Sequence, residues 1–462
     1  MNYHFAATLS EADSKRHIPH TFEAPSGCSL IRIDMHYAPR NVNGLNNLLT
    51  LTLFDPQGFR GAGHRGGDTH IVELTPESAT RGYFAGALPA GTWTVQIDTH
   101  LVLPNVAVAY TLDVTVETDA AKAVTSVERV TPDFSRVVNP APGWYRGDLH
   151  SHTLHSDASW TAPELVAAAR QMELDFIALT DHNTVSPLPE MAQLGGDGLL
   201  TMGGQELTTF WGHAVCLGAH EWLDWRVDRD GVGMALIAAR LYAAGQLYII
   251  AHPYDIGDPY CTGCRWLYTQ MMPGNARLIE VWNGPWFGDH PLGHMSNEDG
   301  LAFYYRCLNE GRRLVMTAGS DAHGPKSYER GPGFNVVYAD ELSEPAILRA
   351  LAQGHHYLSS GPALHLHADE GDDAVVMMGD TLTVNGDDDV RQNVHIHADW
   401  ADAPPECTLR LVVNGAVYAQ SVVTPRGEKD WTIPANGVRW CTIELRSQDE
   451  IMLAVANPIF LA

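Results

Sequence analysis

The stretch GDLHSHTLHSD, residues 147–157, places three histidines and two aspartates within eleven positions. In an extended strand alternate side chains share a face, so His150 and His152 would point toward the same spot. Neutral imidazole is the commonest protein ligand for metals, and Asp157 adds a carboxylate that divalent cations also accept. A polar loop with water-facing histidines is the alternative, and the pair alone does not decide.

Further metal-capable side chains follow other apolar runs in the middle of the chain. Because the carboxyl ends of parallel strands gather at one face of an α/β fold, residues at five such ends are expected to meet. The pattern therefore predicts a polynuclear metal site. Its members are Asp181 and His182 in LTDHN, Glu206 in GGQEL, His252 in IIAHP, Glu280 in LIEVWNG, and Asp321 with His323 in AGSDAH.

The elements that would position these residues alternate between strands and helices. FIALTDH, LYIIAHP and LIEVWNG are strand-like, and TAPELVAAARQM opens as a helix with a Thr161–Glu164 capping box and Pro163 in its first turn. Nearly continuous apolar strands that alternate with helices indicate a mainly parallel sheet buried on both faces. A barrel and an open doubly wound sheet both satisfy this pattern.

Short strands without helical periodicity flank this part on both sides. Runs such as CSLIRIDMHY and LLTLTLFD predict an antiparallel sandwich or jelly roll before a proline-ended connector over residues 119–142. Strands return after residue 362, so we expect domains at 1–142, 143–362 and 363–462. The first could bind sugar, cover the active site or dimerise, and a structural role is the preferred interpretation.

The last segment repeats the His-x-His spacing in another setting. His365 and His367, like His395 and His397, lie on alternating strands without carboxylates in their motifs. Surface or cross-strand histidines explain them better than metal ligands do. They therefore serve as an internal control on the spacing.

Composition limits the partners. With 29 basic and 55 acidic side chains the chain carries a net charge of −26, which repels polyanions. We expect a small-molecule substrate rather than a nucleic acid polymer or a membrane. The first 20 residues contain no apolar run with the length of a signal-peptide core, and no later stretch approaches the length of a membrane span, so a cytoplasmic location is the default expectation.

The seven cysteines are scattered, unlike a disulfide framework. Cys261 and Cys264 form the one CxxC pair. With no second pair to complete four thiolate ligands, a buried thiol pair or a reversible disulfide is preferred to a structural zinc.

As an ordered set, HSH with Asp157, TDHN, Glu206, AHP, IEVWNG and GSDAH resembles the PHP (polymerase and histidinol phosphatase) superfamily of metal-dependent hydrolases. ELTTFWGHAVCLG, CTGCRW, IEVWNGPW and NPIF are most similar to its carbaryl-hydrolase-type branch. The likeness covers about residues 143–362 and is weak over the first 120. It implies an α/β fold, a distorted (β/α)7 PHP barrel, which N-terminal and C-terminal all-β domains would flank.

The resemblance also implies the ligands of two or three divalent metal ions. One ion would take His150, His152, Glu206 and Asp321, and a second would take Glu206, His252 and Glu280, with Glu206 bridging. A third would use His182, His323 and Asp157, with His155 as a competitor for the place of Asp157. Imidazole and carboxylate without thiolate fit manganese, zinc or iron.

Two neighbouring cations can bridge a water, lower its pKa from about 15.7 towards 7, and present hydroxide to a substrate held by the same metals. The sequence has neither a GxSxG elbow nor a GxxxxGK[ST] loop, which leaves a serine esterase or a nucleoside triphosphate enzyme without a motif. We therefore predict a hydrolase of small phosphomonoesters or phosphodiesters. An aryl ester or carbamate hydrolase is the alternative, and a non-catalytic, metal-stabilised binding protein is the second.

Other side chains near the motifs are candidates for substrate contacts. His213 in WGHAV is the leading catalytic residue outside the ligand set, and Arg265 in GCRW is the preferred phosphate clamp over Lys326 and Arg330. Tryptophans more often pack than bind, yet four could wall a pocket: Trp211 and Trp282, with Trp266 and Trp286. Asp181 could hold an imidazole or cap the next helix. The β domains could support a homo-oligomer.

Overall fold

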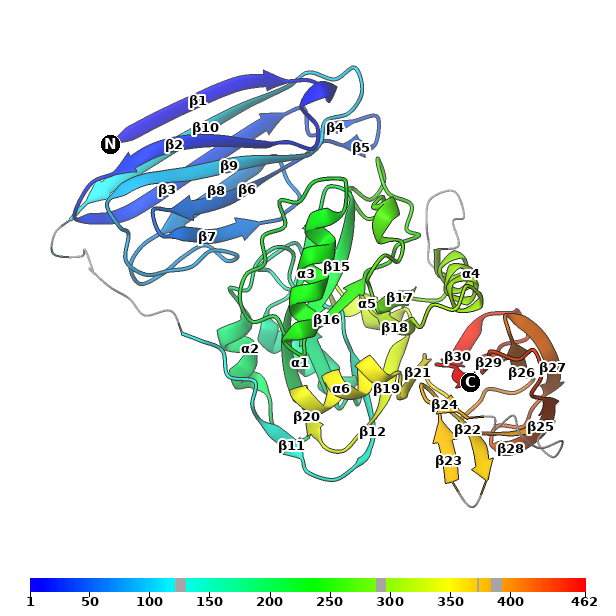
Figure 1. Ribbon diagram of the computed structural model, residues 1–462. Helices are drawn as coiled ribbons and strands as arrows, with labels where there is room; N and C mark the ends of the chain where they lie inside the picture. The colour runs from blue at the N-terminus through cyan, green and yellow to red at the C-terminus, as the bar shows by residue number, and fades with distance from the viewer. Residues whose placement is uncertain (120, 122–129, 288–295, 372–373, 384–392) are drawn as a thin grey trace.

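The computed structural model describes residues 1–119, 121, 130–287, 296–371, 374–383 and 393–462. The architecture is mixed α/β with substantial β content. N-terminal strands lie at one end of the molecule, an α/β region lies in the middle, and C-terminal strands lie at the other end (Figure 1). Within the described residues, no helix combines the length and the apolar character needed to cross a membrane.

The first region is a sandwich of two antiparallel four-stranded sheets. Its strands alternate buried and exposed residues, most regularly at residues 69–74 and 108–116, so each sheet has one apolar face. The two faces enclose a core that includes Ile33, Leu51 and Trp93. The strand order in the first sheet is β1 (Asn2–Leu9), β10 (Val108–Thr118), β3 (Cys28–Ala38), β8 (Thr69–Leu74). The strand order in the second sheet is β2 (His17–Ala24), β9 (Gly91–Leu101), β6 (Leu48–Asp55), β7 (Gly58–Gly63).

Smaller elements complete this region. A 3-10 helix, η1, spans Glu11–Asp13, and a two-stranded ribbon joins β4 (Asn41–Val42) to β5 (Leu45–Asn46). The ribbon lies between β3 and β6 in the chain, at the end of the sandwich that faces the middle region (Figure 1).

The middle region is built on a curled sheet whose strands are almost wholly buried. Burial on both faces is what the continuous apolar runs predict. A parallel bridge between Ser151 and Ala322 brings the chain after the first parallel strand beside the chain after the last one. The sheet order is β18 (Val315–Gly319), β17 (Leu278–Asn283), β16 (Leu247–Ile250), β15 (Gly212–Leu217), β14 (Leu200–Thr209), β13 (Phe176–Leu179), β12 (Gly143–Asp148), β19 (Phe334–Ala339), β21 (His356–Ser359).

Helices connect many of these strands. Thr161 and Glu164 form the predicted capping box of α1, with proline in the first turn. A short antiparallel pair, β11 (Val137–Asn139) with β20 (Leu342–Ser343), joins the connector to this region. The helices are α1 (Ala162–Gln171), α2 (Leu188–Leu194), α3 (Val232–Ala243), η2 (Thr269–Met271), α4 (Ser296–Asn309), α5 (Pro325–Glu329) and α6 (Glu344–Gln353).

The regular alternation of seven strands with seven helices is not present in the described residues. β14 and β15 are antiparallel neighbours joined by a tight turn, in which Gly212 has φ +144° and a Cβ would meet Trp266 at 2.6 Å. Residues 251–277, between β16 and β17, contain only the 3-10 helix η2. An additional antiparallel strand, β15, is thus inserted after β14, before the helix α3 leads on to β16.

The C-terminal strands form a second sandwich that shares a sheet with the middle region. β21 pairs with β30, so the central sheet continues into the last strands. The two sheets enclose a core with Leu366, Ile396 and Leu409. Its strands are β22 (Ala363–Gly371), β23 (Ala374–Met377), β24 (Thr381–Leu382), β25 (Asn393–Ala401), β26 (Thr408–Val413), β27 (Ala416–Val422), β28 (Gly427–Pro434), β29 (Trp440–Arg446), β30 (Met452–Ala456) and β31 (Ile459–Leu461).

Candidate metal centre

The His-x-His pair lies just beyond β12 and is fixed by backbone hydrogen bonds to the segment after β18. The His152 N–H donates to Ala322 O, and the Asp321 N–H donates to His150 O, both at 3.0 Å. The pair and the aspartate therefore lie side by side, with His152 Nε2 2.9 Å from Asp321 Oδ1. This backbone pairing brings residues 170 positions apart into one site.

Glu206, near the end of β14, is fully buried, and most of the predicted ligands surround its carboxylate. Burial alone would raise the pKa of Glu206, but the surrounding imidazoles hold it well below its usual range. The nearest nitrogens are those of His182 at 2.8 Å, His213 at 3.0 Å, His252 at 3.1 Å, His150 at 3.2 Å and His152 at 3.4 Å.

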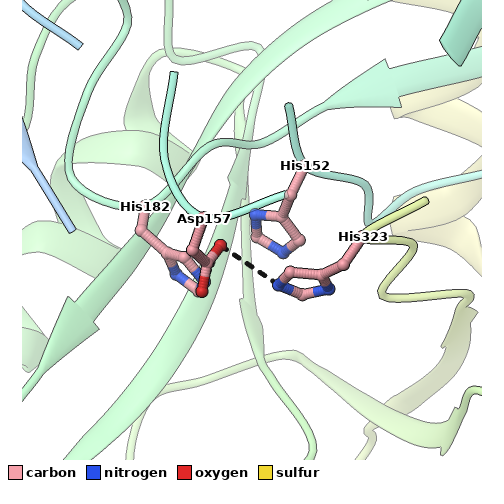
Figure 2. A group of neighbouring side chains, drawn as sticks. All are labelled: His152, Asp157, His182 and His323. Atoms are coloured by element: carbon pink, nitrogen blue, oxygen red, sulfur yellow. Dashed lines mark ion pairs between the residues drawn. The ribbon is translucent and has the colours of Figure 1, made fainter. Parts of the chain in front are cut away.

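A second cluster lies beside the first. Figure 2 shows Asp157 and His323 facing each other, with the imidazoles of His152 and His182 turned toward the same space. Asp157 Oδ1 lies 3.2 Å from His323 Nε2 and 3.5 Å from His182 Nε2. Burial lowers the pKa of His323, but the charge of Asp157, the hydrogen bond to it and the contacts with Asp321 together outweigh burial and raise that pKa to about 10.

Around Glu206 and Asp157 the potential ligand atoms form three groups, in each of which the atoms lie within 4.8 Å of one another. Two of them contain every residue that the resemblance implies for the first and the third metal. The groups are His150, His152, Glu206 and Asp321; His152, Asp157, His182 and His323; and His182, Glu206 and His213.

These groups fit divalent cations because they contain buried polar atoms that no described residue satisfies. Neighbouring atoms are close but not aligned for hydrogen bonds, whereas buried polar groups are normally bonded. Imidazole and carboxylate donors around such atoms are the ligand types that manganese, zinc and iron accept. The unsatisfied atoms are His150 Nε2, His152 Nδ1 and Nε2, Glu206 Oε2, His213 Nε2, His252 Nδ1 and Asp321 Oδ1.

The carboxylates favour positive charge at some of these imidazoles but not at all of them. Burial lowers the pKa of His252, but its hydrogen bond to Glu206 and the nearby carboxylates raise the pKa to about 9. Burial and the neighbouring His182 and His323 lower the pKa of His152 to about 3. A cation could replace the protons that the carboxylates otherwise attract, which is the usual coupling of metal binding to proton release.

The resemblance implies Glu280 as a ligand together with Glu206 and His252. In the structure it contacts the nitrogen of His150 that faces away from Glu206. Its Oε1 is 3.0 Å from His150 Nδ1, and its Oε2 accepts hydrogen bonds from the His252 N–H and from Asn283 Nδ2, each at 3.0 Å. None of the three ligand groups contains it. In this position its carboxylate fixes the orientation of an imidazole.

Two other buried carboxylates brace the loops that carry the ligands. Asp148 accepts from the Ser320 N–H at 3.0 Å and from the Tyr328 hydroxyl at 3.0 Å. Asp181 accepts from the Thr153 N–H at 2.8 Å and from the Ser156 hydroxyl, and burial raises its pKa to about 6. The two roles predicted for Asp181 were wrong: it neither holds an imidazole in the described contacts nor caps α2.

Two ligand positions have a backbone that side chains rarely adopt. His252 has φ +25° and Asp321 has φ +51°. Residues held in such conformations cost on the order of 1–3 kcal/mol each and cluster at functional sites. The surrounding structure therefore imposes these conformations where the ligand atoms converge.

A cavity of about 280 Å³ opens onto the cluster. His213 lines it, and so do the Cys261–Cys264 disulfide and its neighbours Pro259, Tyr260 and Thr262. A disulfide is one of the two states that the sequence predicts for the CxxC pair, the other being a pair of buried thiols.

Other expected substrate contacts lie elsewhere. Arg265 is exposed and does not line this cavity. Trp282 is fully buried in the core, where its indole N–H donates to Gly284 O at 2.9 Å. Trp211 is partly buried between Lys15 and Arg229, outside the cavity lining.

The remaining wall comes from residues that the sequence did not single out. Arg40, Asn46, Asn47, Leu48, His64 and Gly66 of the N-terminal sandwich all line the cavity. The ring of His64 lies 4.7 Å from that of His182, centroid to centroid. The one hint in the sequence is the glycine-rich GAGHRGGD segment, which resembles an ordinary turn.

The histidines of the C-terminal sandwich lie on exposed or half-buried strand faces. His365 and His367 both contact Asp399, at 2.8 and 3.2 Å, and His397 lies between Asp369 at 3.0 Å and Asp430 at 2.6 Å. They are cross-strand histidines, as predicted, with carboxylate partners that come from neighbouring strands.

No family model matches the chain. A 5'-3' exoribonuclease, Rnm, from Escherichia coli K12 is 34% identical over 111 residues, which are 21% of this chain and 38% of that protein. Rnm from Salmonella typhimurium is 39% identical over 67 residues, 14% of this chain and 23% of that protein. The chain thus spans well under half the length of either relative.

Among solved structures, a two-domain protein from Bacteroides vulgatus that contains a PHP-like metal-dependent phosphoesterase is 17% identical with a TM-score of 0.38. The match covers 72% of this chain and all of that one. An amidohydrolase from Chromobacterium violaceum is 20% identical with a TM-score of 0.26, over 39% of this chain and 88% of the other.

Proposed function

We propose that this protein is a PHP-type, metal-dependent hydrolase of small phosphomonoesters or phosphodiesters. The observation that carries the proposal is the set of buried, unsatisfied imidazole and carboxylate atoms that converge around Glu206. Such a set is expensive to bury unless it binds something cationic. Two or three divalent cations, of manganese, zinc or iron, would be held by the residues of the two four-residue ligand groups, with His252 beside Glu206.

When bound, such cations polarise a substrate oxygen and lower the pKa of a water molecule. The side chains of the protein hold the imidazoles in position and hold or move a proton. Glu206 holds imidazoles from several segments at one point, and Glu280 orients His150. His213, whose Nδ1 contacts Glu206, has its Nε2 unpartnered within the described residues at the cavity wall, so that nitrogen is our candidate for holding or moving a proton near the substrate.

The volume of the cavity limits the size of the substrate. A space of about 280 Å³ admits a small ester or the end of a chain, and not a duplex. The acidic chain also disfavours a long polyanion. The two exoribonuclease relatives favour a phosphodiester as one of the bonds broken. An aryl ester or carbamate is the alternative substrate class for the same centre.

Turnover of a small substrate panel tests the proposal. Metal-loaded protein would be incubated with p-nitrophenyl phosphate, bis-p-nitrophenyl phosphate, a 5'-phosphorylated oligoribonucleotide, p-nitrophenyl acetate and carbaryl. We expect hydrolysis of at least one phosphate ester, lost in Glu206→Gln with the circular dichroism spectrum unchanged. Hydrolysis of only the acetate and carbaryl would establish the alternative instead.

A non-catalytic, metal-stabilised binding protein would behave differently. The native protein would hydrolyse none of the five compounds, and Glu206→Ala would unfold the chain rather than inactivate it. Elemental analysis of protein purified without added metal gives the number and identity of the ions in either case.

A further inference from the structure

The cavity over the metal centre has two walls of different origin. Asp157, His182, His213, His252, Asp321 and His323 come from the middle region, whereas Arg40, Asn47 and His64 come from the N-terminal sandwich. The substrate side of the site is therefore bounded by a separate part of the chain.

The sandwich is fixed in this position by specific contacts. Lys15 Nζ donates to Phe210 O at 3.0 Å and pairs with Asp258 at 2.7 Å. At the other side of the contact, the Thr184 hydroxyl donates to Gly82 O at 2.8 Å. Gly82 has φ +90°, and a Cβ there would meet His155 O at 2.7 Å, so the sandwich backbone packs directly against the loop that carries Asp157.

Arg40 is the one arginine that lines this cavity within the described residues. Its backbone is anchored, because the Asn47 N–H donates to Arg40 O at 2.7 Å and Asn47 Nδ2 donates to Pro39 O at 2.8 Å. No carboxylate of the described residues pairs with its guanidinium, although the chain has nearly twice as many acidic as basic side chains. An exposed arginine left unpaired on an acidic protein is available for an anionic ligand.

The hollow next to this cavity has the same character. Arg65 and Arg81, also from the sandwich, line it, and it shares Gly66 and Asp157 with the cavity over the metal centre. Arg65 also takes part in the contact between the sandwich and the middle region, since it donates to Leu154 O at 3.4 Å. The sandwich thus presents basic groups where the site opens.

We infer that Arg40 binds the anionic group of the substrate, so that the N-terminal sandwich sets the specificity of a centre whose ligands all lie in the middle region. The inference rests on the proposed hydrolase and narrows its substrates to esters with a free anionic oxygen, such as phosphate monoesters. A guanidinium can donate two parallel hydrogen bonds to such a group, which a neutral ester cannot use.

Arg40→Ala and Arg40→Lys test the role, with two matched controls. Arg32→Ala removes an arginine of the same sandwich that is paired with Asp34 and Glu73, and Arg265→Ala removes the clamp expected from the sequence. For p-nitrophenyl phosphate we expect Arg40→Ala to raise KM about tenfold or more with kcat changed less than about threefold. Arg40→Lys should recover part of the loss, and any background hydrolysis of the neutral ester p-nitrophenyl acetate should be the same in all variants.

Calorimetric titration of metal-loaded protein with inorganic phosphate gives a readout that needs no turnover. We expect Arg40→Ala to weaken phosphate binding about tenfold, at unchanged metal content, and both control variants to bind like the native protein. Native affinity in Arg40→Ala, or a loss in Arg265→Ala instead, would overturn the inference. If the native protein hydrolyses no ester but binds phosphate through Arg40, the hydrolase proposal fails and the binding role stands.

Discussion

The His-x-His spacing occurs both beyond β12 and on the strands β22 and β25, and the two settings differ in burial and in partners. His150 and His152 are fully buried and share Glu206 and Asp321 with each other. His367 and His397, with side chains 36% exposed, contact only aspartates on neighbouring strands, Asp399 for the first and Asp369 and Asp430 for the second.

The difference shows what the spacing can and cannot specify. Two imidazoles on one strand face can always share a neighbour, but a cation site needs donors from several other segments at the same point. Beyond β12 the ends of other central strands supply those donors, and the loops are braced by Asp148 and Asp181. On the C-terminal strands the histidines pair with aspartates of neighbouring strands, and none of their atoms is among the buried, unsatisfied polar atoms of the described residues.

The sharpest test of this comparison is His152→Ala against His367→Ala. Because His152 takes part in two ligand groups, we expect its loss to remove at least one metal ion and to lower kcat/KM by about 1000-fold or more. His367→Ala should leave both unchanged. Elemental analysis and steady-state kinetics measure the effects, and similar behaviour of the two variants would refute the distinction.

A smaller effect is expected from the carboxylates that support the histidines. Glu280→Gln removes an acceptor behind His150, so metal affinity should fall about 10- to 100-fold at unchanged stoichiometry. Asp399→Asn, which removes the negative charge and one of the two oxygens that contact His365 and His367, should not change metal affinity. Competition with a chelator measures both. The loss of a whole metal equivalent in Glu280→Gln would instead show that Glu280 is itself a ligand.

The smallest effect concerns pH and the exposed histidines. The hydrogen bond to Asp369, followed by that to Asp430, raises the pKa of His397 above its ordinary value of 6.5. A raised pKa in the folded state stabilises the fold below the unfolded pKa, and this gain is lost as the pH rises through the folded pKa.

Urea unfolding at pH 5.5 and pH 9 measures this gain. Native protein should exceed His397→Gln in free energy of unfolding at the lower pH, by less than about 1 kcal/mol because the pairs are solvent-screened. The difference should vanish at the higher pH. An equal or larger difference at pH 9 would contradict the assignment.

Much of the site could be predicted from the sequence because its residues follow recognisable elements. Glu206 and His252 follow apolar runs that do form β14 and β16, and the capping box that starts α1 is local chemistry. The reversal at β15 could not be predicted, since it depends on Gly212 packing against Trp266 far along the chain. Arg40 lies more than 100 positions from every ligand and looks, in sequence, like any exposed arginine.

The pairing of β21 with β30 has a consequence for how the protein is made. Strand β21 of the central sheet gains its second partner, β30, only after residues 452–456 have left the ribosome. Until then β21 presents an open edge to the cell, and such edges invite association with other chains. Newly synthesised chains should therefore depend on chaperones late in translation, and ribosomes stalled before codon 452 should carry an aggregation-prone product.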